Sequence, residues 1–261
     1  MRLVTYDRGG HRRLGAILGG EVVDLPDAVG HPAFPTTLEA LVSSSRGSVM
    51  DAARAALERD EAYGRAVKRA RILTPLFPRS LLAPGALDLE RRIVGPEDEV
   101  PWPEGAAWLD YEPMVAAVLG SEVSNANASH IRENVFGYTL VSGWTARAAD
   151  GDPVATAEGL PMAIGPCVVT ADHLDPQSIW VQLRVDGEEV LKGNLNGTAA
   201  SLFALIADAS QDSVLERGDA FALEPFARDP GGPSHQLWPG ALVELGAEGI
   251  GTLRNRLAPR T

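Results

Sequence analysis

The chain has 261 residues, of which 45% are hydrophobic and 22% are charged, and its formal net charge is −12. This composition is typical of a globular protein that buries a full core. The acidic balance argues against nucleic-acid binding, because contacts with phosphates need clustered Lys and Arg side chains.

The single cysteine and the hydropathy pattern predict the cellular compartment. Cys167 has no second cysteine to pair with, which excludes an internal disulfide and favours a reducing cytoplasm. It lies in an apolar run without an activating neighbour, so we interpret it as an inert buried thiol. No apolar run approaches the roughly 18 residues of a membrane span, and the first residues do not resemble a signal peptide. We therefore expect a cytoplasmic protein with no membrane partner.

Short β-rich runs and a helix are predicted for the first third of the chain. Val4, residues 16–18 and residues 22–23 predict a small sheet, with Gly19-Gly20 as a two-residue hairpin turn. Residues 49–72 then follow a helical pattern, which predicts one long helix.

Prolines mark the boundary between two predicted lobes. Pro75 and Pro78 interrupt any regular element after the predicted helix. We therefore divide the chain into a small N-terminal α+β lobe, residues 1–72, and a main lobe, residues 73–261.

The main lobe is predicted to be rich in β-structure. From Trp108 onward, short β-rich runs alternate with Gly and Pro. One helix is predicted at residues 198–210, because Leu202, Phe203 and Ile206 follow a helical spacing. The fold class expected for the whole chain is α+β, with a sheet-rich roll as the main domain.

Two runs of the main lobe carry a recognisable pattern. They read LDYEPMVAAVLG at residues 109–120 and VFGYTLVSGWTAR at residues 135–147. Together they resemble the signature of the fumarylacetoacetate hydrolase superfamily, D-Y-E-x-E-L-A-x-V-I-G followed by G-Y-T-x-x-N-D-x-[ST]-A-R-D. Shorter matching segments follow the family's order over most of the chain. The resemblance implies a mixed β-sandwich roll with a small N-terminal α+β lobe, and assembly as a homodimer.

The resemblance also implies a magnesium or manganese site, and this chain has lost most of it. In the family, both Glu of E-x-E and the Asp of the N-D pair hold the metal. Only Glu112 matches, because Met114 and Gly143 stand at the other two places. A thioether is a poor ligand for magnesium, and glycine offers no side chain. We therefore expect no metal and no other cofactor.

The alternative is a metal site rebuilt from other carboxylates. Three acids lie close enough in the sequence to replace the lost ligands: Asp150, Asp152 and Glu158. Such a site would restore the metal-dependent hydrolase, so this alternative remains open at the level of sequence.

Other groups that the family uses are missing as well. The family's catalytic His has no counterpart between Arg79 and Val100, and Thr156 stands where a Lys is common. Glu224-Pro225 replaces a Gly-Thr that contacts substrate in the family. A standard metal-dependent hydrolysis would therefore lack its Lewis acid, its base and its anion-binding groups.

Three carboxylates are candidate catalytic residues. Strand alternation predicts that Asp110, Glu112 and Met114 project to one face. Glu112 is the first candidate for a general acid or base, and the alternative is an inherited acid that is hydrogen-bonded to a backbone amide. Glu224 is the second candidate, unless the proline after it redirects the loop, and Glu158 is the third.

Five residues are candidates for substrate contact: Arg147, Trp144, Tyr111, Met114 and His235. Arg147 suits a carboxylate or an enolate. Its alternative role is a structural ion pair with Asp150 or Glu158.

For the other four candidates, the alternative to substrate contact is a position in the core or at the surface. Trp144 and Met114 would form apolar walls of a pocket, although a core position is the usual role of a tryptophan. Tyr111 points to the face opposite Glu112, which favours the core over substrate contact. His235 follows a run of Gly and Pro, where exposure to solvent is common.

Three functions fit these residues. The first is an enzyme that has abandoned the metal and acts on a small enolisable carbonyl or carboxylate metabolite, as a cyclase, an isomerase or a C–C-cleaving enzyme with an acid–base mechanism. The second is a non-catalytic relative that binds a ligand or a partner. The third is the magnesium- or manganese-dependent hydrolase with substitute ligands.

Overall fold

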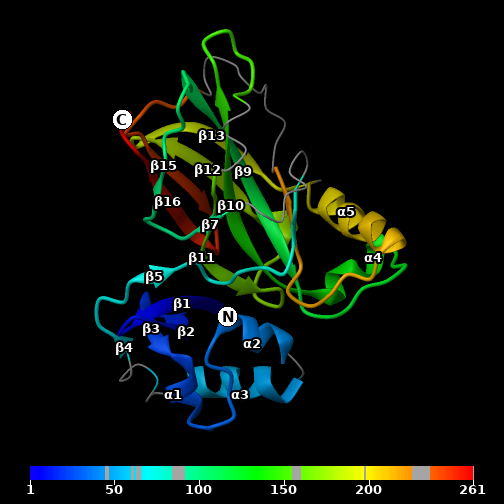
Figure 1. Cartoon of the computed structure of the whole chain (residues 1–261). Helices are drawn as coiled ribbons and strands as arrows, with labels where there is room; N and C mark the ends of the chain where they lie inside the picture. The colour runs from blue at the N-terminus through cyan, green and yellow to red at the C-terminus, as the bar shows by residue number, and fades with distance from the viewer. Residues whose placement is uncertain are drawn as a thin grey trace.

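Two β-sheets pack face to face, and the helices lie at the N-terminal end and along one side (Figure 1). The structure is a computed structural model, and it describes residues 1–44, 47–59, 62, 66–83, 92–154, 160–196, 198–224 and 236–260. The α+β class and the sheet-rich main lobe predicted from the sequence are confirmed. Within the described ranges, no helix combines the length and apolar character that crossing a membrane requires.

The larger sheet contains strands from the N-terminal part of the chain and strands from the main part. Its strands lie in the order β4 (Ala66–Val67), β3 (Glu21–Asp24), β2 (His11–Leu18), β1 (Arg2–Arg8), β11 (Met162–Thr170), β10 (Val135–Arg147), β9 (Trp108–Leu119), β14 (Ala220–Leu223) and β6 (Leu81–Leu82). Two short strands branch from this path: β5 (Ile72–Leu73) pairs with β1, and β7 (Ile93–Val94) pairs with β11.

The smaller sheet covers the main part of the larger one. Its order is β13 (Glu188–Asn194), β12 (Trp180–Val185), β15 (Leu242–Ala247), β16 (Gly251–Leu257) and β8 (Glu99–Val100). Strands β15 and β16 contact β10 and β11, so the main core lies between the two sheets. Cys167 is buried in this core, where its thiol donates to the carbonyl oxygen of Ile250 at 3.1 Å and burial raises its pKa.

Five α-helices complete the described fold. They are α1 (Leu25–Val29), α2 (Leu38–Ser43), α3 (Gly47–Leu57), α4 (Ala128–Ile131) and α5 (Thr198–Asp212). Helix α5 confirms the helix that its apolar spacing predicts, and it runs two residues longer. It buries Leu202 and Ile206 against the main core, and it lies with α4 on one side of the sheets (Figure 1).

The hairpin between β2 and β3 is confirmed. Leu18 pairs with Glu21, which leaves Gly19-Gly20 as the two-residue turn. Both glycines have positive φ, 59° and 88°, as the turn type that suits a two-residue hairpin requires.

The long helix predicted at residues 49–72 is wrong. Helix α3 ends at Leu57, and residues 66–67 and 72–73 form the strands β4 and β5. Val67 pairs with Val22, and a turn with Arg69 at a positive φ of 54° joins the two strands. Pairing with distant strands therefore overrides the local helical pattern.

The two lobes share one sheet. Leu3 of β1 pairs with Val168 of β11, so the N-terminal strands extend the main sheet without a break. Tyr6 of the same strand pairs with Ile72 of β5. Strand β5 covers residues 72 and 73, so the predicted boundary after residue 72 falls inside a strand. The division into two lobes at that residue stays a prediction.

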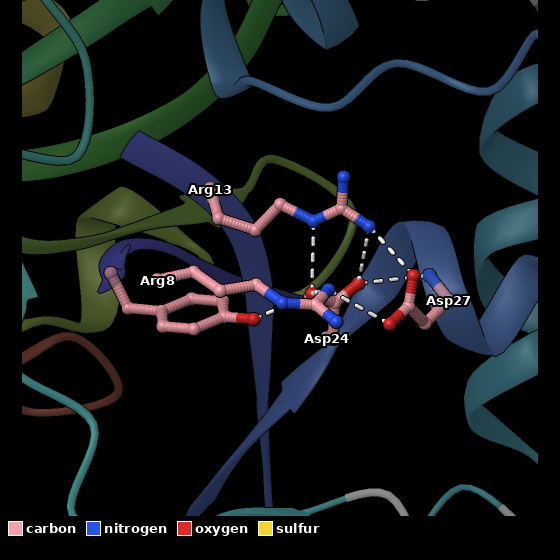
Figure 2. A network of polar contacts seen from close by, with 5 residues as sticks. Arg8, Arg13, Asp24 and Asp27 are labelled. Atoms are coloured by element: carbon pink, nitrogen blue, oxygen red, sulfur yellow. Dashed lines mark hydrogen bonds and ion pairs between the residues drawn. The ribbon is translucent and has the colours of Figure 1, made fainter. Parts of the chain in front are cut away.

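A buried carboxylate ties the N-terminal elements together (Figure 2). Asp24, at the end of β3, accepts hydrogen bonds from the Tyr6 hydroxyl at 2.5 Å and from the Arg13 guanidinium at 2.9 and 3.1 Å. Arg8 donates to it at 2.6 Å, and the backbone N–H of Asp27 donates at 2.8 Å, which caps α1. One side chain thus connects β1, β2, β3 and α1.

Candidate functional site

The register of β9 and β10 places the predicted site residues side by side. Glu112 pairs with Gly143, Asp110 with Thr145 and Met114 with Val141. Directly paired residues of antiparallel strands project to the same face. We call this row the Glu112 strip and define it by six residues: Arg147, Asp110, Thr145, Glu112, Gly143 and Met114.

The carboxylate of Glu112 is held by one neighbour and packed against another. The Thr145 hydroxyl donates a short hydrogen bond to Glu112 Oε1. A Cβ atom added to Gly143 would lie 2.8 Å from Glu112 Oε2 and 3.3 Å from Met114 Cε. The absence of a side chain at position 143 therefore gives the Glu112 carboxylate its place, and Thr145 fixes its direction.

Replacing Gly143 by Ala is expected to turn the Glu112 carboxylate away from Thr145. The closest atom to the new methyl group is the far end of a flexible side chain, so the cost in unfolding free energy should stay near 1 kcal/mol. Urea unfolding and a crystal structure of the variant measure both effects. Gly47→Ala is the matched control, because a Cβ at Gly47 meets nothing within 4 Å. A Glu112 that keeps its Thr145 bond in the Gly143 variant would contradict this reading.

Arg147 pairs with a buried aspartate at one end of the strip. Its Nη2 lies 3.6 Å from Asp110 Oδ2, and the Asp110 side chain is completely buried. Arg147 Nη1 also donates to the carbonyl oxygen of Gly151 at 3.1 Å. Among the described residues, the ion pair of Arg147 is therefore with Asp110 and not with Asp150. The other partner that the sequence offered, Glu158, lies outside the described residues.

The other end of the strip is apolar. Met114 is 2% exposed and packs in a cluster with Val141, Met162 and Ile164. This cluster lies on the face of the sheet opposite the main core, because alternate residues of β9 belong to the two different clusters. The strip therefore runs from a charged end at Arg147 to an apolar end at Met114.

Trp144 and Tyr111 lie on the other face of the same strands. They pair with each other across β9 and β10, and each is 2% exposed within the main core. Direct neighbours along a strand point to opposite faces. The structure thus places both aromatic side chains in the main core, on the face opposite Glu112. This is the face that strand alternation predicted for Tyr111, and it is the alternative to the pocket wall that was given for Trp144.

The remaining candidates fall at the edge of the site or outside the described residues. Glu224 is half-buried and follows directly after β14, whose last pair joins Leu223 to Val115. In this register, position 224 is therefore opposite Met114, at the point where the chain leaves the sheet. Glu158 and His235 lie outside the residues that the structure describes.

The described residues do not fit the divalent metal of the family. Glu112 is the one carboxylate at the three ligand positions, and the Met114 methyl group lies against Gly143. Asp150 accepts a hydrogen bond from the Asp152 backbone at 3.2 Å, within its own turn. In the part of the chain that the structure describes, no three His, Cys, Asp or Glu side chains gather as a metal site.

Two features of the site were not singled out from the sequence. Thr145 lies in the quoted motif, at its [ST] position. The sequence alone does not indicate which carboxylate its hydroxyl group binds. Asp110 was placed on the correct face by strand alternation, yet its pairing with Arg147 depends on the register between β9 and β10. Both contacts, Thr145 with Glu112 and Arg147 with Asp110, could have been predicted if that register had been known.

Comparison with known proteins identifies the family. A model of the fumarylacetoacetate (FAA) hydrolase C-terminal region matches residues 76–258. The chain belongs to this family. The resemblance seen in the sequence is therefore confirmed.

Solved structures agree with the fold. The fumarylacetoacetate hydrolase of the psychrophilic Exiguobacterium antarcticum matches over 100% of both chains, with a TM-score of 0.76 and 21% identity. Maleylpyruvate hydrolase from Sphingobium sp. SYK-6, in complex with manganese(II) and pyruvate, also matches over 100% of both chains, with a TM-score of 0.76 and 22% identity. At these identities the likeness shows the fold alone.

Curated relatives match over part of their length. The mitochondrial oxaloacetate tautomerase of Xenopus laevis is 32% identical over 136 residues, which cover 49% of this chain and 43% of that protein. The matched regions span 64%, 43% and 60% of the lengths of three such relatives.

Proposed function

We propose that this protein is a metal-independent isomerase of the family, which moves a proton on a small enolisable carbonyl compound. The observation that carries the proposal is the Glu112 carboxylate, held by Thr145 over Gly143 without a second carboxylate at the ligand positions. One oriented carboxylate is sufficient for acid–base catalysis. It is not sufficient for a hydrolysis that needs a metal-activated water.

The strip supplies the groups for a proton shift. The Glu112 carboxylate removes a proton from the carbon beside the carbonyl group, and the carbonyl oxygen takes the negative charge as an enolate. Arg147 Nε has no hydrogen-bond partner among the described residues, and we assign it as the donor to that oxygen. Protonated Glu112 then returns the proton to the oxygen or to another carbon. The Glu112 carboxylate is regenerated. The only σ-bonds that break or form are bonds to hydrogen.

The relatives support this class of reaction. One of them is named as an oxaloacetate tautomerase, and tautomerases interconvert keto and enol forms. A proton shift between such forms is the simplest reaction that a single carboxylate performs. Cyclisation or C–C cleavage would need a further polar group, for which Glu224, level with Met114, is the described candidate.

A non-catalytic relative is the second candidate function. Met114 is 2% exposed, and it fills space where a metal ligand stands in the family. A strip that is closed by Met114 would leave no room for a reacting carbonyl group. This candidate predicts that no small enolisable compound loses a proton to the protein.

Metal titration separates the proposal from the ancestral hydrolase. Saturation of a metal site at 100 times its dissociation constant would add about 2.7 kcal/mol and raise the melting temperature by several degrees. We expect no shift with magnesium or manganese. We also expect that EDTA leaves the exchange of α-protons of a keto ester for deuterium unchanged.

Each contrary result has a definite meaning. A clear shift with manganese would revive the hydrolase, with Asp150, Asp152 or Glu158 as substitute ligands. Exchange that stops in EDTA would have the same consequence. Exchange at the rate of a protein-free blank would favour the non-catalytic relative.

A further inference from the structure

We infer that the substrate of the Glu112 strip is an uncharged enolisable carbonyl compound with an apolar substituent, and not a carboxylate anion. The inference rests on the proposed function and narrows its substrate class. Three observations carry it: the charges of the strip, the charges around its Arg147 end and the apolar character of its Met114 end.

The charges of the strip do not favour an anion. Arg147 supplies the one cation of the strip, and Asp110 pairs with it at 3.6 Å. Glu112 adds a negative charge whose described partner is the neutral hydroxyl of Thr145. The strip therefore carries a net charge of −1, and like charges in a poorly hydrated site repel strongly.

The surroundings of Arg147 do not reverse this balance. The turn that follows β10 carries Asp150 and Asp152, and Arg147 itself binds the carbonyl oxygen of Gly151 in that turn. A hollow of 730 Å³ lies beside the same end, where the backbone N–H of Ala107 donates to the Arg147 carbonyl oxygen.

That hollow has one charge of each sign on its walls. Arg260 stacks over the Trp102 ring at 5.9 Å and donates to the Ala106 carbonyl oxygen at 2.9 Å. Glu104 lines the same hollow, so the two charges of its walls sum to zero. The hollow therefore adds no net positive charge to this end of the strip among the described side chains.

The Met114 end of the strip suits an apolar substituent. Met114, Val141, Met162 and Ile164 form one cluster beside Glu112, and their side chains offer no hydrogen bond to a polar group. Methionine is flexible and adapts to the shape of an apolar partner. A carboxylate placed there would lose its water without compensation.

The test compares oxaloacetate with its diethyl ester, which has the same reacting carbon and no carboxylate group, at a pH below the pKa of the enol of the ester so that the ester is uncharged. Proton NMR in deuterium oxide with EDTA follows the exchange of the methylene protons, each rate being divided by its protein-free rate. We expect the wild-type protein to accelerate exchange in the ester at least tenfold more than in the dianion. Equal or greater acceleration for the dianion would overturn the inference.

Asp110→Asn tests the charge argument within the protein. Removal of this carboxylate leaves the charge of Arg147 uncompensated, so the preference for the ester should fall at least threefold. Glu216→Gln is the matched control, because it removes an acid that pairs with Arg79 at 3.1 Å on the surface, and it should leave the preference unchanged. An equal effect of both variants would overturn the charge argument.

The same experiment distinguishes failure of the substrate class from failure of the function. Exchange that favours the dianion and depends on Glu112 overturns the substrate class and leaves the proposed function standing. Absence of acceleration for both compounds overturns the proposed function, and the inference falls with it. If Asp110→Asn does not fold, the ester-to-dianion ratio of the wild-type protein still decides the question.

Discussion

Replacing Glu112 by Gln is expected to lower the rate of proton exchange by about 10²- to 10⁴-fold, the usual contribution of a general acid–base group. Gln has nearly the same volume, and its amide oxygen can still accept the hydrogen bond from Thr145. The fold should therefore be unaffected. The measurement is the exchange rate of the diethyl ester at saturation, together with the melting temperature of the variant.

Variants of Thr145 provide the matched control for this result. Thr145→Ser keeps the hydroxyl and should keep most of the activity. Thr145→Val keeps the shape but removes the donor, and a hydrogen bond to a charged group contributes about 1.5–3 kcal/mol, so the rate should fall about tenfold or more. Unchanged turnover in the Glu112 variant would remove this residue from the mechanism.

Replacing Asp24 by Asn is expected to lower the free energy of unfolding by about 3 kcal/mol at pH 7. The change leaves Arg8 and Arg13 without their shared carboxylate, and the Asp24 side chain is only 6% exposed (Figure 2). The value lies at the lower end of the usual range because Arg8 is 53% exposed and regains water. Urea unfolding measures the loss.

The effect of this change should depend on pH. Burial opposes ionisation of Asp24, but hydrogen bonds from Arg13, Tyr6 and the Asp27 backbone outweigh it and hold the pKa of Asp24 below its usual value. A carboxylate with a lowered folded-state pKa stabilises the fold above its unfolded pKa of about 3.9. That stabilisation disappears as the pH falls through the folded-state pKa. The difference between wild type and Asp24→Asn should therefore be complete at pH 7 and shrink below pH of about 4.

A surface aspartate offers the control. Asp172 pairs with Arg54 at 3.0 Å, and both side chains are largely exposed, 49% and 40%. Exposed pairs contribute less than about 1 kcal/mol, so Asp172→Asn should cost little. Similar losses for both aspartates would show that the Asp24 network does not hold the N-terminal elements together.

Local and periodic signals in the sequence predicted the parts of the fold that local physics determines. The Gly19-Gly20 turn and the helix α5 follow from backbone freedom and from apolar spacing. Strand alternation also placed Asp110, Glu112 and Met114 on one face. The predicted helix at residues 49–72 failed because β4 and β5 pair with strands far away in the sequence, and no local pattern records such partners.

In the candidate site, too, residue types could be interpreted from the sequence, whereas contacts between strands could not. The loss of the family's ligands was visible at Met114 and Gly143, since residue types alone decide what can hold magnesium. What Glu112 does instead depends on contacts across strands, with Thr145 on one side and the empty space of Gly143 on the other. The partner of Arg147 was missed for the same reason, because it lies 37 residues earlier in the chain, at Asp110.

The pairing of β1 with β11 has a consequence for how the protein is made. Leu3 meets its partner Val168 only after 165 further residues have been synthesised, which takes on the order of ten seconds at usual rates of translation. During that interval the first rungs of β1 present an unpaired backbone edge on the nascent chain, next to the exit tunnel of the ribosome. Such an edge is prone to pair with other chains. The newborn N-terminal strands are therefore the part of this protein for which a chaperone should matter most.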